Sequence, residues 1–221
     1  MPSSLGRTLF LPVRPAGAGK TYVASRVIDS YLSDPAPESK LVYFYCNRTE
    51  ESRRQPESIL RALVRQLAKS EGEVLEPVVG IYNGREGKGQ LSQCLTLAEC
   101  QDLLVQLTDA YPQTTICIDA LDEVDHTKRL KLLHALKYLV ERSKNVVKIF
   151  ATTRMDTDIL LQFEAFPRIE LQPDDNVADI NQFVTTTVQE AIEQEQLLHG
   201  DVTNELRDEI CKVLCERSKG M

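Results

Sequence analysis

AGAGKT, residues 16–21, is the stretch that decides the fold. Its glycines, Gly17 and Gly19, let the backbone turn tightly and aim N–H groups at phosphate oxygens. Lys20 would reach the β- and γ-phosphates of a nucleotide, and the Thr21 hydroxyl would bind Mg²⁺. The alternative is a turn of small residues before a helix. The candidate nucleotide-binding residues of this loop are Gly17, Ala18, Gly19, Lys20 and Thr21.

A second motif, ICIDALDE at residues 116–123, supplies carboxylates. Asp119 ends an apolar strand, where a carboxylate can hold Mg²⁺ directly or through water. Burial of that carboxylate without a partner would be costly. Asp122 and Glu123 follow on the same loop, and either could orient or deprotonate an attacking water. The alternative for this loop is a set of acids that cap the next helix.

The third motif is ATTR at residues 151–154, again at the end of an apolar run. Thr153 and Arg154 sit where a polar or basic side chain could contact the γ-phosphate and report its presence. An arginine at a strand end does not by itself indicate a function, but here it belongs to the third of three motifs that each follow the carboxyl end of an expected strand. We therefore expect both residues to bind nucleotide.

Short apolar runs alternate with longer amphipathic stretches along the chain, which indicates a mostly parallel sheet with helices on both faces. In such sheets ligands bind beyond the carboxyl ends of the strands, where all three motifs lie. A capping box at Thr96 and Glu99 predicts the start of one helix. The expected strands are residues 8–13, 41–46, 114–119, 146–153 and 168–171, and the expected later helices include residues 128–142, 176–198 and 203–216.

Composition limits the class of protein. The 221 residues are 42% hydrophobic and 27% charged, which is ordinary for a globular domain. The formal net charge of −7 argues against a nonspecific nucleic-acid partner, which requires a broad basic face. None of the six cysteines forms a C-x-x-C pair, which suits a reducing, cytoplasmic compartment. No apolar run reaches the length of a membrane span, so we expect no membrane partner.

AGAGKT, ICIDALDE, IFATTR and the intervening LVYFYCNRTEESRRQPESILRALVRQLA together resemble the NACHT-type STAND P-loop NTPase domain. Within that class, the chain is most similar to the nephrocystin-like N-terminal module of fungal NOD-like receptors. The most specific part is the small residue Ala120 after Asp119, followed by Asp122 and Glu123. The resemblance runs from about Gly17 onward. It implies an additional-strand P-loop fold whose five-stranded sheet has the order 5-1-4-3-2.

The resemblance also implies a function: a conformational switch driven by ATP or GTP with Mg²⁺, reset by slow hydrolysis. Such switches work in innate immunity or heterokaryon incompatibility, between an effector domain and C-terminal repeats, and can self-associate when nucleotide binds. Thr21 and Asp119 would hold the metal, and Asp122 and Glu123 would serve hydrolysis. The alternatives are a degenerate interaction scaffold without nucleotide binding and another P-loop ATPase.

The N-terminus departs from the family pattern. Arg14 stands where the standard loop has its first glycine, and Ala16 stands where family members tend to carry proline. Pro12 would remove a ladder hydrogen bond from a strand that should be central. These departures predict weak nucleotide binding. The expected segments are an atypical N-terminus with a replaced first strand (1–16), a nucleotide-binding core (17–175) and the start of a helical extension whose helices are incomplete (176–221).

Overall fold

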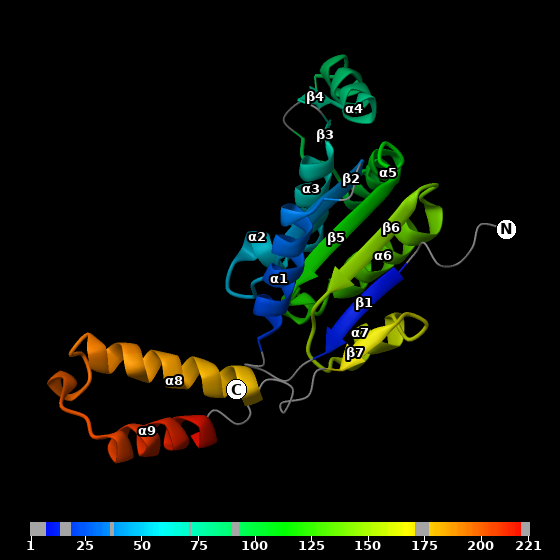
Figure 1. Cartoon of the computed structure of the whole chain (residues 1–221). Helices are drawn as coiled ribbons and strands as arrows, with labels where there is room; N and C mark the ends of the chain where they lie inside the picture. Colours follow the sequence, from blue (N-terminus) through cyan, green and yellow to red (C-terminus); the bar gives the residue numbers. More distant parts are fainter. Residues whose placement is uncertain are drawn as a thin grey trace. The chain divides into compact units, whose positions relative to one another are not determined.

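The computed structural model describes residues 8–13, 19–35, 38–70, 72–89, 93–170 and 177–217 (Figure 1). The chain divides near residue 170 into an α/β unit and a helical unit, which are described separately. The expected boundary at residue 175 lies in the stretch 171–176, outside the described residues.

The α/β unit is built on a five-stranded sheet with the order β2-β5-β6-β1-β7. Numbered along the chain and read from the β7 edge, this order is 5-1-4-3-2, which corresponds to the order that the resemblance implies. β6 therefore lies between β1, which leads into AGAGKT, and β5, which ends at Asp119. Such an inserted strand defines the additional-strand class of P-loop fold. The strands are β1 (Thr8–Val13), β2 (Ser39–Tyr45), β5 (Gln113–Asp119), β6 (Val146–Ala151) and β7 (Arg168–Glu170).

β1 forms in spite of its proline. Its register with β6 aligns Thr8 with Lys148 and Phe10 with Phe150, and the two strands are parallel. Pro12 lies beyond the last of these pairs, so its missing N–H does not interrupt them. Thr8–Val13 thus occupies the inner position of the sheet that a first strand of this fold requires.

β2 and β5 pair in parallel over their full length, from Ser39 opposite Gln113 to Tyr45 opposite Asp119. β6 runs parallel to β5 on its other side. The carboxyl ends of these strands therefore meet at one edge of the sheet, which is where the acidic and ATTR motifs lie. β6 ends at Ala151, two residues earlier than expected, and Thr152 begins the loop.

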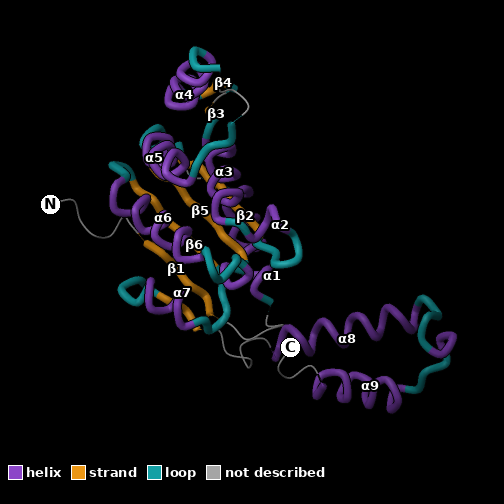
Figure 2. The backbone as a smooth tube through the Cα atoms, turned by 180° about the vertical axis from the view of Figure 1, so that it is seen from behind, coloured by secondary structure: helices purple, strands orange, loops and turns teal. Residues whose placement is uncertain are grey.

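Helices cover both faces of the sheet (Figures 1 and 2). On one face α1 packs Ala24 and Ile28 against Cys117 of β5. On the other face α3, α5 and α6 pack against Ile116 and Ile118 of the same strand. The helices of this unit are α1 (Lys20–Ser33), α2 (Glu51–Arg54), α3 (Pro56–Leu67), α4 (Glu76–Glu86), α5 (Leu97–Thr108), α6 (Arg129–Arg142) and α7 (Thr157–Gln162).

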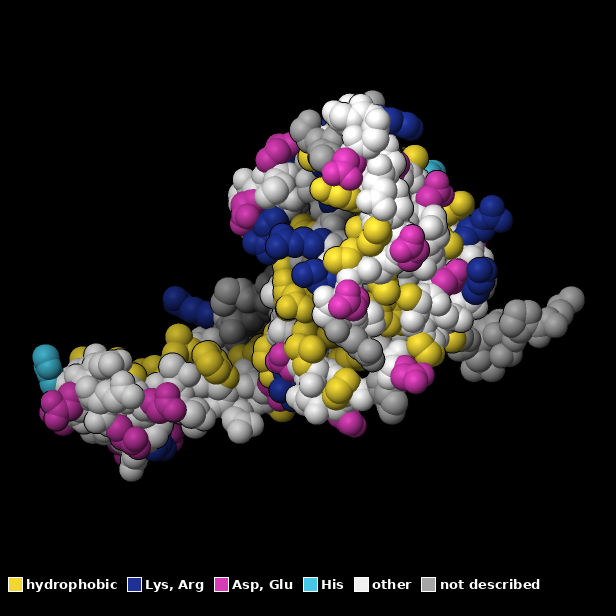
Figure 3. Space-filling view, turned by 90° about the horizontal axis from the view of Figure 1, so that it is seen from above, with side chains coloured by type: hydrophobic (Ala, Val, Ile, Leu, Met, Phe, Trp, Pro, Cys, Tyr) yellow, Lys and Arg dark blue, Asp and Glu magenta, His cyan; other side chains and the backbone are white. Residues whose placement is uncertain are grey.

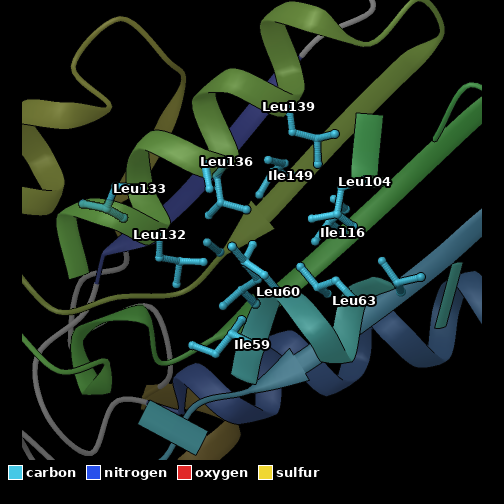
Figure 4. Packing of buried hydrophobic residues seen from close by; sticks show 14 of the residues in the cluster. Ile59, Leu60, Leu63, Leu104, Ile116, Leu132, Leu133, Leu136, Leu139 and Ile149 are labelled. Atoms are coloured by element: carbon cyan, nitrogen blue, oxygen red, sulfur yellow. The ribbon is translucent and has the colours of Figure 1, made fainter. Parts of the chain in front are cut away.

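The larger core is mostly aliphatic (Figure 4) and includes two buried aromatic residues, Tyr111 and Phe163. Leu60 and Leu63 of α3 lie toward Ile116 of β5, and leucines of α6 close the same layer. Alternate residues of β5 thus serve opposite layers, because successive side chains of a strand point to opposite faces. A small hairpin of β3 (Lys69–Ser70) and β4 (Glu73–Val74) links α3 to α4.

The capping box that opens α5 is confirmed. The Thr96 hydroxyl accepts from the N–H of Glu99, and the Glu99 carboxylate accepts from the N–H of Thr96. Arg85 adds two hydrogen bonds of 2.8 and 2.9 Å to the same carboxylate. The hydrogen bond from the N–H of Thr96 contributes most, and that from Arg85 next, to lowering the pKa of Glu99 to about 2. The first turn of α5 is therefore fixed by an ionised side chain.

The β2 edge of the sheet is covered by a side chain of α3. The Oε1 atom of Gln66 accepts from the N–H of Tyr43 at 2.9 Å, and its Nε2 atom donates to the carbonyl of Tyr43 at 2.8 Å. The amide thus bonds the backbone of β2 as a neighbouring strand would.

The helical unit consists of α8 (Val177–Glu193), a short 3₁₀ turn η4 (Leu198–Gly200) and α9 (Asn204–Arg217). α8 and α9 pack against each other, but Val188 is the one buried side chain in residues 177–217, and Phe183 is 70% exposed. These residues carry nine Asp or Glu side chains against three Lys or Arg, and several of the acidic ones are visible in Figure 3. No helix in the described ranges is long and apolar enough to cross a membrane.

Candidate nucleotide-binding site

The described half of the AGAGKT loop is the N-terminus of α1. Gly19 is the N-cap and has a φ of +73°, a conformation that a residue with a Cβ adopts only at a cost. Lys20 is the first helical residue. The first turn of α1 carries no acidic residue and no side-chain cap, which leaves its N–H groups available to an anion. Gly17 and Ala18, like Arg14 and Ala16, lie outside the described residues.

Thr21 and Asp119, the two predicted metal ligands, lie together although 98 positions separate them. The Thr21 hydroxyl donates to the Oδ2 atom of Asp119 at 2.7 Å. Asp119 is buried at the end of β5, as expected. In the described parts of the chain, no group of three or more His, Cys, Asp or Glu side chains is arranged to hold a metal ion. A hydroxyl and a carboxylate are oxygen ligands of the kind that Mg²⁺ takes, and this ion completes its shell with phosphate oxygens and water.

Thr152 completes the site, although the sequence did not single it out. Its hydroxyl donates to the Oδ1 atom of Asp119 at 2.5 Å and accepts from the N–H of Ala120 at 2.8 Å. Ala120 has a φ of +54°, the left-handed region, so the chain turns sharply directly after Asp119. Thr152 thus fixes both the carboxylate and the turn that follows it. The sequence feature that could have indicated this role of Thr152 was the pair of adjacent threonines in ATTR.

We expect Thr152→Val to destabilise the protein by about 1–3 kcal/mol, because valine keeps the shape but leaves two buried polar groups without their partner. Thr114→Val is the matched control. The Thr114 hydroxyl is buried in β5 without a hydrogen-bond partner, so its loss should be neutral or stabilising. Urea denaturation of both variants measures the difference. An equal effect of the two substitutions would show that the Thr152 hydroxyl does not support Asp119.

Asp122 and Arg154 bind each other. The Oδ1 atom of Asp122 accepts from the N–H of Arg154 at 3.0 Å, and its Oδ2 atom lies 3.0 Å from Arg154 Nε. The second contact is an ion pair whose angle is unsuited to a hydrogen bond. The Asp122 side chain is 2% exposed, whereas that of Arg154 is 40% exposed. Asp122 is thus directed at Arg154, whose guanidinium reaches solvent.

Glu123 has a different environment from Asp122, although the two are adjacent on the 3₁₀ turn η2 (Leu121–Glu123). It is half-buried, and its Oε2 atom accepts from the N–H of Arg48 at 3.2 Å. Glu123 lines a cavity of about 500 Å³ beside the acidic loop, together with Arg48 and Arg54. Its carboxylate therefore has one protein donor and adjoins open space.

Thr153 lies apart from these groups. Its side chain is buried, and its hydroxyl donates to the carbonyl of Arg154 at 3.1 Å. The described contacts of ATTR thus divide three ways: Thr152 bonds Asp119, Arg154 pairs with Asp122, and Thr153 bonds the carbonyl of the next residue.

Two cysteines flank Asp119 but offer no nucleophile. Burial first, and the charge of Asp119 second, raise the pKa of Cys117 to about 12. The same two causes raise the pKa of Cys46, whose N–H donates to the carbonyl of Asp119. Both side chains are thiols at neutral pH and pack as small apolar groups.

Several solved structures are similar to this chain, including the following three. A DNA replication initiation factor is 15% identical with a TM-score of 0.44, and the match covers 98% of this chain and 52% of the other. A Walker-type ATPase of Pyrococcus abyssi is 13% identical with a TM-score of 0.47, and the match covers 94% of this chain and 57% of the other. DnaA from Aquifex aeolicus bound to AMPPCP is 14% identical with a TM-score of 0.38, and the match covers 93% of this chain and 50% of the other. The chain thus spans about half the length of these structures.

The structures that are similar to the chain also include DnaA with single-stranded DNA and Drosophila ORC with AT-rich DNA and Cdc6. The expectation that nucleic acid is not a partner of this chain stays a prediction. A search of curated proteins finds no match to this chain.

The sequence also matches one protein family, described as nephrocystin 3, N-terminal, over residues 4–154. The match begins before Gly17, so the N-terminal stretch that was expected to lie outside the resemblance is part of it. It ends at Arg154, so β1, the phosphate loop, the acidic motif and ATTR all lie within it. Because the match covers more than half of the 221 residues, the chain belongs to the nephrocystin 3, N-terminal family.

Proposed function

We propose that this chain is the nucleotide-binding switch module of a NOD-like receptor type of protein, which binds ATP or GTP with Mg²⁺ and hydrolyses it slowly. The observation that carries the proposal is the 2.7 Å hydrogen bond between Thr21 and Asp119. It joins the end of the phosphate loop to the acidic motif, and these are the two groups that would hold Mg²⁺. When bound, the ion would neutralise charge on the β- and γ-phosphates.

The protein groups would divide the work as follows. Lys20 and the N-terminal N–H groups of α1 would bind the phosphates. Arg154 would contact the γ-phosphate, since its guanidinium is the part of the Asp122–Arg154 pair that reaches solvent. A triphosphate would compete with Asp122 for Arg154, whereas a diphosphate would leave the pair intact.

This competition supports a switch rather than a fast enzyme. Turning a two-state protein from mostly off to mostly on requires about 5.5 kcal/mol of differential binding. Contacts that exist only with the γ-phosphate are the source of such a difference. Hydrolysis would remove them and reset the switch. Both acids line the cavity, but the Asp122 side chain is 2% exposed and is held by Arg154, whereas Glu123 is half-buried and accepts from one N–H, so Glu123 rather than Asp122 would handle water.

We further propose the setting that the family resemblance implies. The module would act in the cytoplasm between an effector domain and C-terminal repeats, in innate immunity or heterokaryon incompatibility, and would self-associate in a nucleotide-dependent manner. The alternatives are a scaffold without nucleotide binding and another P-loop ATPase.

Lys20→Ala tests nucleotide binding directly. At a hundredfold excess over Kd, nucleotide should stabilise the parent by about 2.7 kcal/mol, and the variant should lose this stabilisation. Thermal unfolding is measured with and without ATP or GTP and Mg²⁺ at millimolar concentration, to allow for a weak site. Lys131→Ala, an exposed change on α6, is the control and should respond like the parent. A parent that neither nucleotide stabilises would favour the scaffold; an equal shift in Lys20→Ala would remove Lys20 from the site.

A further inference from the structure

Arg129, the first residue of α6, is a buried cation outside the predicted set of site residues. Its side chain is 6% exposed. Its Nη1 atom donates to the carbonyl of Asp122 at 3.0 Å and lies 3.0 Å from the Oδ2 atom of Asp156. Its Nε and Nη2 atoms donate to the two carboxylate oxygens of Asp158 at 3.0 and 2.8 Å. All three nitrogen atoms of the guanidinium thus have a partner.

These contacts join two segments that are distant in sequence. Asp122 belongs to the acidic loop, whereas Asp156 and Asp158 open α7 directly after ATTR. The same segments are also joined directly, by the contacts of Thr152 with Asp119 and Ala120, by the N–H of Leu121 to the carbonyl of Thr152 and by Arg154 to Asp122. Arg129 links these two segments from a third element, α6.

The geometry requires arginine rather than any cation. A buried charge is unfavourable unless it is paired and hydrogen-bonded, and here two carboxylates and a carbonyl satisfy it. The planar fork of arginine matches a carboxylate at two atoms while its remaining N–H groups reach elsewhere. Lysine would keep the charge but could not bond Asp158 at two atoms and Asp122 as well.

We propose that Arg129 is a positioning residue that presents Arg154 to the γ-phosphate by holding the backbone of Asp122 and the start of α7. The inference rests on the proposed nucleotide-binding function. Arg129 touches neither Arg154 nor a predicted phosphate ligand; it acts through Asp122 on one side and through Asp156 on the other. Its loss should therefore weaken discrimination between a triphosphate and a diphosphate, while Lys20, Thr21 and Asp119 still bind both.

Two variants and one control test this role. Arg129→Lys removes the fork and keeps the charge, and Asp158→Asn weakens the same contact from the other side. Arg142→Lys makes the same chemical change at the exposed end of α6. The first measurement is hydrogen exchange of the Leu121 and Arg154 amides in the nucleotide-free protein, with the Cys46 amide as internal reference. The second is the ratio of affinities for AMPPCP and ADP, and for GMPPCP and GDP, with Mg²⁺.

In both variants we expect exchange at Leu121 and Arg154 to rise at least tenfold while exchange at Cys46 is unchanged. We expect the ratio of triphosphate to diphosphate affinity to fall at least fivefold, and Arg142→Lys to match the parent. Unchanged exchange at Leu121 and Arg154 would overturn the positioning role, whether or not nucleotide binds. Faster exchange with an unchanged ratio of triphosphate to diphosphate affinity would show that Arg129 has only a structural role, which would also overturn the proposal. A parent that binds none of the four nucleotides, with Arg129→Lys and Asp158→Asn still showing faster exchange, would refute the proposed function instead.

Discussion

Replacing Glu123 by glutamine is expected to slow nucleotide hydrolysis by about 100-fold or more, the usual contribution of a positioned acid or base, and to leave nucleotide affinity unchanged. Glutamine is isosteric and retains an oxygen that can accept from the N–H of Arg48, so the acidic loop should keep its conformation. What is lost is the negative charge beside the cavity, which orients or deprotonates the attacking water. Single-turnover phosphate release measures the rate, and calorimetric titration measures the affinity.

Asp122→Asn provides the comparison for this experiment. Asp122 directs both carboxylate oxygens at Arg154, so its amide should disturb Arg154 and the triphosphate contact, with a fall in affinity. Loss of hydrolysis at unchanged affinity in Asp122→Asn, together with a parent-like rate in Glu123→Gln, would transfer the water-handling role to Asp122.

Asp119→Asn should lower affinity for the Mg²⁺–nucleotide complex at least a hundredfold, or about 2.7 kcal/mol. Asparagine is isosteric and can still bond the hydroxyls of Thr21 and Thr152, so the variant should fold. It lacks the negative charge that attracts the cation in a buried site. Affinity measured in EDTA should change little, because the phosphate loop is intact.

Asp102→Asn, an exposed substitution on α5, is the control for this loss and should bind like the parent. The dependence of affinity on Mg²⁺ concentration is the decisive quantity. An Asp119→Asn variant that retains the parent's dependence would exclude Asp119 as a metal ligand.

The fold was largely predictable because its strongest signals are local. The alternation of apolar runs with amphipathic stretches predicted the five strands of the main sheet and the longer helices, and the Thr96–Glu99 box marked the start of α5. The short helices α2 and α7 and the hairpin of β3 and β4 were not predicted. The order of the strands came from the resemblance instead. Periodicity shows that a segment is a strand but not which strand lies beside it, and the place of β6 between β1 and β5 is a long-range property.

The site was predictable where chemistry alone identifies a residue. Thr21 and Asp119 are metal-ligand types in recognisable motifs, and the structure brings them together. Thr152 was missed because its partner depends on where β6 ends relative to β5, which the sequence does not show. Arg129 was missed because a basic residue at a helix start is ordinarily solvent-exposed, and only packing shows otherwise.

Asp122 and Glu123 illustrate a finer limit. In sequence they are equivalent carboxylates, one residue apart, and either suits the handling of water. The 3₁₀ turn sends their side chains in different directions, so that Asp122 meets Arg154 and Glu123 meets the N–H of Arg48 beside a cavity. The two residues differ in the direction of their side chains, which composition and spacing do not show.

Gln66 limits how this module can meet other proteins. A peptide that added itself to β2 as a new strand would have to displace an amide that already bonds both backbone groups of Tyr43. Continuous cross-molecular sheets, the route by which many exposed edges aggregate, are therefore disfavoured at this position. Nucleotide-dependent self-association on this side of the module should then proceed through the helical and loop surfaces beside β2, whose contacts can be made and released reversibly as a switch requires.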